Sequence, residues 1–172
     1  MRFVGTGYRV HDPRWSFRPL SGDGAAIHGG RFNPKSVPAI NLSLDLVTAV
    51  REGNQGFAGK IEPCVLCSYE VDCADITDLR TDAACVALGV VFEDLACPWA
   101  MLALERKPVS SQQLAARLIA EGQAGVLVPS FAVGSGPDSH NLVLWRWGPK
   151  LPHRVRVHDP SGRLPKSQLS WD

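Results

Sequence analysis

The chain has 172 residues and a mass of 18.6 kDa, which is the size of one domain. Hydrophobic residues make up 45% of it, and 5 Trp, 6 Phe and 2 Tyr are more aromatic surface than a disordered chain leaves in water. A formal net charge of +1 argues against a strongly basic protein that binds nucleic acid non-specifically. We therefore predict one globular domain over residues 1–172.

In chain order, the sequence predicts short strands with helices between some of them. Alternating polar and apolar residues, or short apolar runs bounded by Gly and Pro, mark the strands. The predicted strands are residues 7–10, 38–42, 64–71, 75–78, 125–129, 141–147 and 153–157. Residues 16–38 hold so many Gly and Pro that we expect a loop there.

Capping residues and apolar periodicity predict the helices. These are residues 44–52, 99–105 and 111–121. Ser43 is the expected N-cap of the first, which stops at Gly53 before a loop over 53–59. Ser110 and Gln113 form a capping box at the start of the last. Strands and helices mix without regular βαβ alternation, which is typical of an α+β protein or of a mixed α/β protein with an irregular sheet.

The cysteines are typical of a cytoplasmic protein whose thiols are reduced. Cys64 and Cys67 form a CxxC pair, but side chains three apart on a strand point to opposite faces. We interpret both as buried, inert thiols rather than as a metal or redox pair. Five cysteines are an odd number, and the sequence shows neither a signal peptide nor an apolar run long enough to cross a membrane. We expect a cytoplasmic protein with reduced thiols and without metal.

A cluster of cationic side chains near the end of the chain has two interpretations. Arg154, Arg156 and His158 share one face of a predicted strand. Together with a surface aromatic such as Trp15, they could form the binding surface of a noncatalytic module that binds a protein or a nucleic acid. A solvated edge strand explains the same residues, and we favour it.

A longer pattern spans most of the chain. Its parts are GGRFNP at 29–34, INLS at 40–43, Glu52, GVLVPS at 125–130 and NLVLW at 141–145. This order of motifs resembles the RES-domain family, which is named after an arginine, a glutamate and a serine. The matching positions here are Arg31, Glu52 and Ser130.

The resemblance implies a toxin of a bacterial type II toxin–antitoxin system that consumes NAD as its substrate. It implies an ADP-ribosyltransferase-like fold, a mixed sheet core flanked by short helices. The leading expectation is transfer of ADP-ribose to a protein; the alternative is an NAD phosphorylase that uses phosphate as acceptor. The implied partner is a cognate antitoxin of the Xre helix-turn-helix type that blocks the active site, with neither membrane nor direct nucleic-acid contact.

The resemblance also assigns roles that suit the chemistry of NAD. Arg9 and Arg31 are expected to hold the pyrophosphate, since guanidinium groups bind phosphate bidentately. Glu52 is expected to stabilise positive charge on the ribose, and Arg31 counts with it as catalytic. Ser130 is expected to contact a phosphate or the carboxamide. A helical wheel alone places Glu52 off the apolar arc and predicts a solvated side chain.

One position departs from the family pattern. Asn41 stands where the family usually has a tyrosine near the nicotinamide, and we still expect Asn41 to be among the residues that bind NAD. Asparagine cannot stack on a ring, so we expect weaker activity or another aromatic in its place. Tyr8, Phe32 and Phe57 are the candidates.

Overall fold

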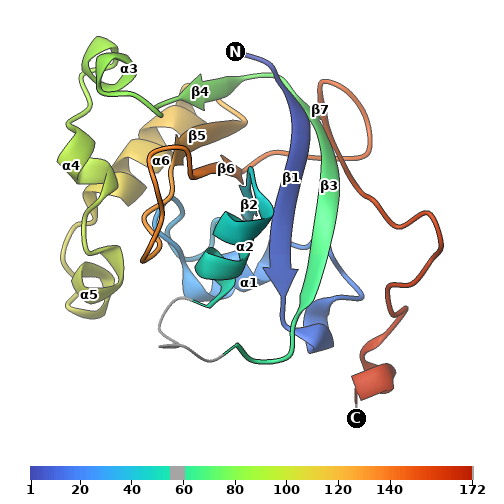
Figure 1. Ribbon diagram of the computed structural model, residues 1–172. Helices are drawn as coiled ribbons and strands as arrows, with labels where there is room; N and C mark the ends of the chain where they lie inside the picture. The colour runs from blue at the N-terminus through green and yellow to red at the C-terminus, as the bar shows by residue number, and fades with distance from the viewer. Residues whose placement is uncertain (55–60, 172) are drawn as a thin grey trace.

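The computed structural model describes residues 1–54 and 61–171 (Figure 1). In these residues seven strands form one mixed sheet in the order β4-β5-β6-β2-β1-β3-β7. The strands are β1 (Phe3–His11), β2 (Ile40–Ser43), β3 (Val65–Cys73), β4 (Ile76–Asp78), β5 (Gly125–Pro129), β6 (His140–Leu144) and β7 (His153–Val157). Only the β4–β5 pair is parallel.

Short helices flank this sheet. They are α1 (Asp23–His28), α2 (Leu46–Gly53), α3 (Asp82–Ala87), α4 (Phe92–Leu95), α5 (Trp99–Leu104) and α6 (Ser110–Ala120), with 3-10 turns at Pro13–Trp15 and Gln168–Trp171. None of the helices in the described part of the chain combines the length and hydropathy that a membrane crossing requires. The structure is therefore an α+β fold with a mixed sheet and short flanking helices, as the sequence predicts.

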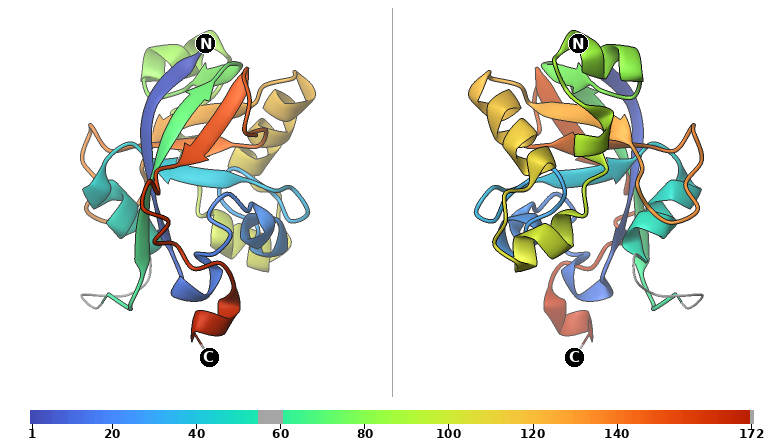
Figure 2. Two further views of the ribbon diagram at one scale, coloured as in Figure 1. Left: turned by 90° about the vertical axis from the view of Figure 1, so that its right-hand side faces the viewer. Right: turned by 90° about the vertical axis from the view of Figure 1, so that its left-hand side faces the viewer.

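The sheet consists of two halves that meet at a narrow seam. β1 pairs with β3 along its whole length, from Phe3 to His11, but with β2 only through Tyr8 opposite Ser43. Figure 2 shows β1, β3 and β7 running steeply across the direction of β2 and β5. Gly7 makes this crossing possible, because a Cβ there would lie 2.9 Å from the Cβ of Leu42.

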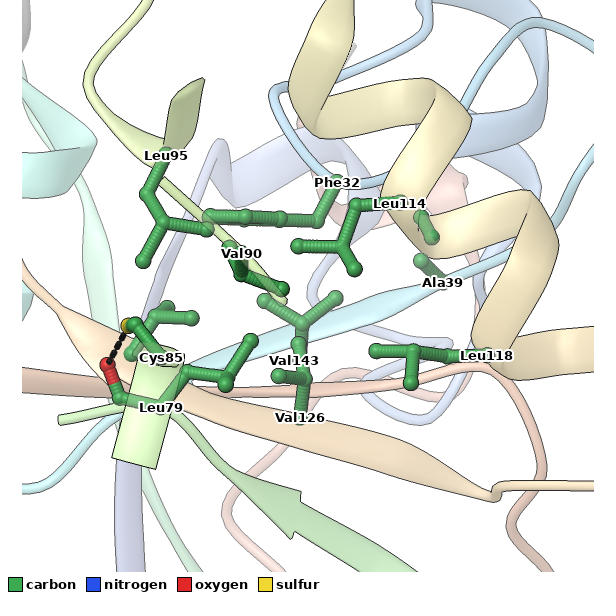
Figure 3. Packing of buried hydrophobic residues seen from close by; sticks show 12 residues of the cluster. Phe32, Ala39, Leu79, Cys85, Val90, Leu95, Leu114, Leu118, Val126 and Val143 are labelled. Atoms are coloured by element: carbon green, nitrogen blue, oxygen red, sulfur yellow. Dashed lines mark hydrogen bonds between the residues drawn. The ribbon is translucent and has the colours of Figure 1, made fainter. Parts of the chain in front are cut away.

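Both faces of the sheet are buried near its centre. Val126 and Val143 point to the face covered by α6, where they pack with Leu114 and Leu118 (Figure 3). Leu127, between two valines on β5, points to the other face and joins the second core cluster. Burial on both faces explains why β5 is an uninterrupted apolar run in the sequence.

The predicted strands are all present, whereas several helix predictions need correction. α1 lies inside the predicted loop of residues 16–38, and α3 and α4 were not predicted. Asp45, not Ser43, caps α2, because its carboxylate accepts from the backbone N–H of Thr48 and Ser43 belongs to β2. The capping box at Ser110 is absent: Val109 is the N-cap, and the Ser110 hydroxyl donates to Asp94 O instead. Most of the predicted loop at 53–59 lies outside the described residues.

Candidate functional site

A pocket opens at the seam between the two halves of the sheet. Its walls come from β1, the turn at 30–32, β2, α2, the start of α5, the end of β5 and β6. Arg9, Arg31, Asn41 and Glu52 all line it. The structure thus brings together four of the five residues that the sequence singles out, from segments up to 43 positions apart. The fifth, Ser130, contacts Glu52 directly.

The turn that carries Arg31 is fixed by hydrogen bonds to its backbone carbonyls. The Gln112 amide donates to Gly30 O at 2.9 Å and the Ser111 hydroxyl to Arg31 O at 2.7 Å, both from the first turn of α6. The indole N–H of Trp145 donates to Phe32 O at 2.8 Å. Three consecutive carbonyls are therefore hydrogen-bonded, which anchors the turn where Arg31 meets the pocket.

The guanidinium group of Arg31 is also positioned. Nη1 donates to Cys97 O at 2.6 Å and to Leu95 O at 3.1 Å, and the group lies over the ring of Phe131 at 4.7 Å from its centroid. Burial lowers the pKa of the Arg31 guanidinium, while Cys97 and Glu52 nearby raise it. This arginine is held as a charged group at the wall of the pocket.

Arg9 reaches the pocket from β1, where β1 and β2 diverge beyond Tyr8. Its Nη1 donates to Ser21 O at 3.2 Å. Burial lowers the pKa of Arg9, because the charged form loses its hydration. Within the described residues, neither Arg9 nor Arg31 forms a salt bridge with a carboxylate. Two half-buried cations without such a counter-ion are suited to an anionic ligand.

Glu52 lies near the end of α2, in a network of polar side chains. Its Oε1 accepts a hydrogen bond from the Ser130 hydroxyl at 2.6 Å and another from the amide of Asn141. The Asn141 Oδ1 in turn accepts from the Ser43 hydroxyl at 2.8 Å, and Ser130 also contacts the Ser135 hydroxyl at 2.8 Å. The carboxylate is therefore held in one orientation from two sides.

The helical-wheel prediction for Glu52 is wrong. Glu52 is half-buried at the pocket, and the buried face of α2 is Thr48 and Ala49. Leu46 and Val47, which the wheel places toward a core, are 50% and 58% exposed. The helix is oriented by its packing on β1, where Gly53 meets Val10 so closely that an added Cβ would lie 2.7 Å away.

Ser130 and Asn41 occupy different places in this arrangement. Ser130 is 8% exposed, and its hydroxyl contacts Glu52 and Ser135. Its predicted contact with the phosphate or carboxamide of NAD stays a prediction. Asn41 is exposed and lines the pocket, on the same face of β2 as Ser43. Of the aromatic substitutes, Tyr8 and Phe32 line the pocket, and Phe57 lies outside the described residues.

Three further polar residues of the site were missed by the sequence analysis. Asn141 and Ser43 lie opposite each other in the β2–β6 register and share the pocket face of the sheet. Strand alternation with a polar pair opposite each other was the available signal for them. Ser111 contacts the Arg31 turn from a helix, and no sequence pattern links the two.

The other motifs have structural explanations. Cys64 is exposed, which corrects its prediction as buried, while Cys67 is buried, and both are free thiols. No group of three or more metal-ligating side chains gathers in the part of the chain that the structure describes. Arg154 forms a salt bridge with Asp72 at 3.2 Å on the edge strand β7, in line with the solvated-edge interpretation.

The fold and the site define an α+β protein with a polar pocket at the split of a mixed sheet. The family model of the RES domain matches residues 6–167, so this chain belongs to the RES-domain family. A solved chain from the M. tuberculosis MbcT–MbcA toxin–antitoxin complex has a similar fold, with a TM-score of 0.61 and 22% identity, covering 92% of this chain and 84% of that chain. No curated protein matches this sequence.

Proposed function

We propose that this protein is the toxin of a toxin–antitoxin pair and consumes NAD, transferring its ADP-ribose to a protein. One observation carries the proposal: Arg9, Arg31 and Glu52 line one pocket. NAD needs cations for its pyrophosphate and an anion beside the ribose that becomes positively charged. Membership of the RES-domain family and the likeness to a chain of a toxin–antitoxin complex support the same function.

The reaction breaks the bond between C1′ of the ribose and the nicotinamide nitrogen. Both electrons of that bond go to the nitrogen, so nicotinamide leaves as a neutral molecule and needs no proton. The ribose passes through an oxocarbenium-like state, and the acceptor then supplies an electron pair to C1′. The protein has to hold the dinucleotide and stabilise the positive ribose.

The described residues suit these tasks. Arg9 and Arg31 approach from two walls and would bind the two phosphates, since the remaining guanidinium N–H groups match phosphate oxygens. Glu52, oriented by Ser130 and Asn141, would hydrogen-bond a ribose hydroxyl and stabilise the cation. An oriented charge costs no reorganisation when the bond breaks, which is why the polar network around Glu52 matters for rate.

The acceptor is decided by one experiment with the purified protein. NAD labelled in its adenylate part is incubated with the protein, with and without phosphate, and with a cell extract. Transfer of label to an extract protein is the expected result. Formation of ADP-ribose-1″-phosphate only when phosphate is present would replace protein transfer by phosphorolysis. No loss of NAD under any condition would overturn the proposal as a whole.

A cognate antitoxin of the Xre type is the proposed partner. The two arginines form a local positive site in a chain of near-zero net charge, and it would attract an acidic or carboxylate-ended segment that takes the place of the phosphates. Co-expression should abolish growth inhibition by the toxin. Purified antitoxin should compete with ADP-ribose for the pocket, and simultaneous binding of both would contradict occlusion.

A further inference from the structure

The pocket has four aromatic side chains, and two of them are already engaged. Phe32 is 4% exposed and belongs to the core cluster under α6. Phe131 lies under the guanidinium of Arg31 and packs on Phe92 with 6.3 Å between ring centroids. Tyr8 and Trp99 remain as rings that can meet a flat ligand group.

Trp99 differs from the two tryptophans that stabilise the fold. The indole N–H of Trp145 donates to Phe32 O, and that of Trp147 to Leu20 O at 3.0 Å. Both rings pack against a core cluster. Trp99 is only half-buried and packs in neither cluster, and its indole N–H, unlike its backbone N–H, donates to no residue that the structure describes. A buried indole N–H usually has such a partner, so within the described residues Trp99 is not tied into the fold as Trp145 and Trp147 are.

The position of Trp99 places it at one end of the pocket. It is the first residue of α5, a helix with no buried residue, and it lies two residues after Cys97, whose carbonyl accepts from Arg31. Glu52 belongs to α2, which Figures 1 and 2 show well apart from α5. Tyr8 lies on β1, against which α2 packs. Trp99 is therefore on the Arg31 side of the pocket, and Tyr8 is on the side of α2.

From this placement we infer that Trp99 is the stacking residue for the adenine ring of the dinucleotide. The inference rests on the proposed function. If the nicotinamide ribose lies at Glu52 and the pyrophosphate at Arg31, the adenosine half extends beyond Arg31 toward α5. An aromatic face there binds a base through stacking, which is insensitive to the hydrogen-bonding edge of the base. Tyr8 is then the ring nearest to the nicotinamide half.

The test is ligand binding without turnover. Calorimetry measures AMP, ADP-ribose and nicotinamide mononucleotide against the parent protein, Trp99→Ala and Trp99→Phe. Trp15→Ala is the matched control, because Trp15 is exposed and lies outside the pocket. We expect Trp99→Ala to weaken the binding of AMP and ADP-ribose roughly tenfold and to leave the binding of nicotinamide mononucleotide unchanged. Trp99→Phe and the control should bind all three within about threefold of the parent, because a phenyl ring still stacks.

A fluorescence measurement covers the case in which Trp99→Ala does not fold. AMP should quench part of the parent's tryptophan emission, and Trp99→Phe should lose that quenching while Trp15→Phe retains it. Unchanged quenching in Trp99→Phe, or unchanged AMP binding in folded Trp99→Ala, overturns the stacking role and leaves the proposed function intact. If Trp99→Ala weakens the binding of nicotinamide mononucleotide alone, the dinucleotide lies in the opposite orientation, and this also overturns the adenine-stacking role. A parent protein that binds none of the three ligands overturns the proposed function as well.

Discussion

The side-chain amide of Asn141 donates a hydrogen bond to Oε1 of Glu52, across 89 positions of sequence. β6 pairs with β2, and α2 begins three residues after β2 ends. The start of β6, the end of β2 and the end of α2 all line the same pocket. The Ser43 hydroxyl donates to Oδ1 of Asn141 and thereby sets which side of the amide faces Glu52. Asn141 is thus a positioning residue for the carboxylate.

Replacing Asn141 should impair turnover more than binding. We expect Asn141→Ala to lower kcat for NAD consumption roughly ten- to hundredfold, because a hydrogen bond to a charged group is lost and Glu52 can rotate. KM should change much less. The control is Asn54→Ala, which removes an amide that caps the same helix by donating to Val50 O at 2.7 Å. Equal kcat values for the two variants would contradict a positioning role for Asn141.

Arg9 should be needed for ADP-ribose binding and should lower the stability of the fold. Burial lowers its pKa, which means that the folded protein holds the charge at a cost. We expect Arg9→Gln to weaken ADP-ribose binding at least tenfold in calorimetry and to leave Tm unchanged or raised. Arg154→Gln, at the edge strand, is the matched control and should bind normally. A fall in Tm with unchanged ADP-ribose binding would show that Arg9 is structural.

Position 41 allows a gain of activity. Asn41 is exposed at the pocket, so a larger, aromatic side chain fits there without displacing the core. We expect Asn41→Tyr to raise NAD turnover about two- to tenfold, since stacking contributes ~0.5–1.5 kcal/mol beyond the area it buries. Asn41→Ala removes the amide without adding a ring and should show no gain. If the tyrosine variant is no faster than the parent, another ring already serves the nicotinamide.

His11 couples folding to pH through a buried hydrogen bond. The Tyr69 hydroxyl donates to Pro19 O at 3.0 Å, so Nε2 of His11 must carry the proton that it shares with the tyrosine oxygen. Burial, with a smaller contribution from the charge of Arg9, lowers the pKa of His11 from 6.5 to about 4. Between these two values the unfolded chain binds a proton that the folded chain does not, so stability falls as the pH drops from 6.5 to 4.

The His11 effect can be measured by urea unfolding at pH 7 and pH 4.5. The depressed pKa should account for a loss of about 2–3 kcal/mol in the free energy of unfolding over that interval. In His11→Gln, whose amide N–H can still reach Tyr69, this part of the pH dependence should disappear while other titrating groups keep theirs. The same pH dependence in both proteins would refute the assignment.

Strand positions could be predicted from the sequence because their signal is local. β5 was predicted at its observed bounds, as an apolar run between Gly125 and Pro129. The predictions of helix position and buried face were wrong where tertiary contacts outweighed periodicity. Leu46 and Val47 of α2 are exposed because Thr48 and Ala49 pack inward instead. α1 was missed because it has six residues and begins beside Gly22 and Gly24, which read as loop.

The candidate site could be predicted from the sequence only in part. The meeting of Arg31, Glu52 and Ser130 was expected only because the motifs resemble a family, since no spacing rule places a loop, a helix end and a strand end together. The carbonyl contacts that hold Arg31 to Cys97 and Ser111 depend on where α4 and α6 pack. Such long-range contacts leave no periodic signal in one sequence.

If Glu52 stabilises the ribose cation of NAD, the charge of its carboxylate sets the rate at which the purified protein releases nicotinamide from NAD. Glu52→Gln keeps the size of the side chain and one acceptor oxygen for Ser130 and Asn141, and it replaces the charged carboxylate by a neutral amide. We expect the parent protein to release nicotinamide and Glu52→Gln to do so roughly a hundred- to a thousandfold more slowly, with ADP-ribose binding retained. Equal release by both proteins, or none by the parent, would contradict this role of Glu52.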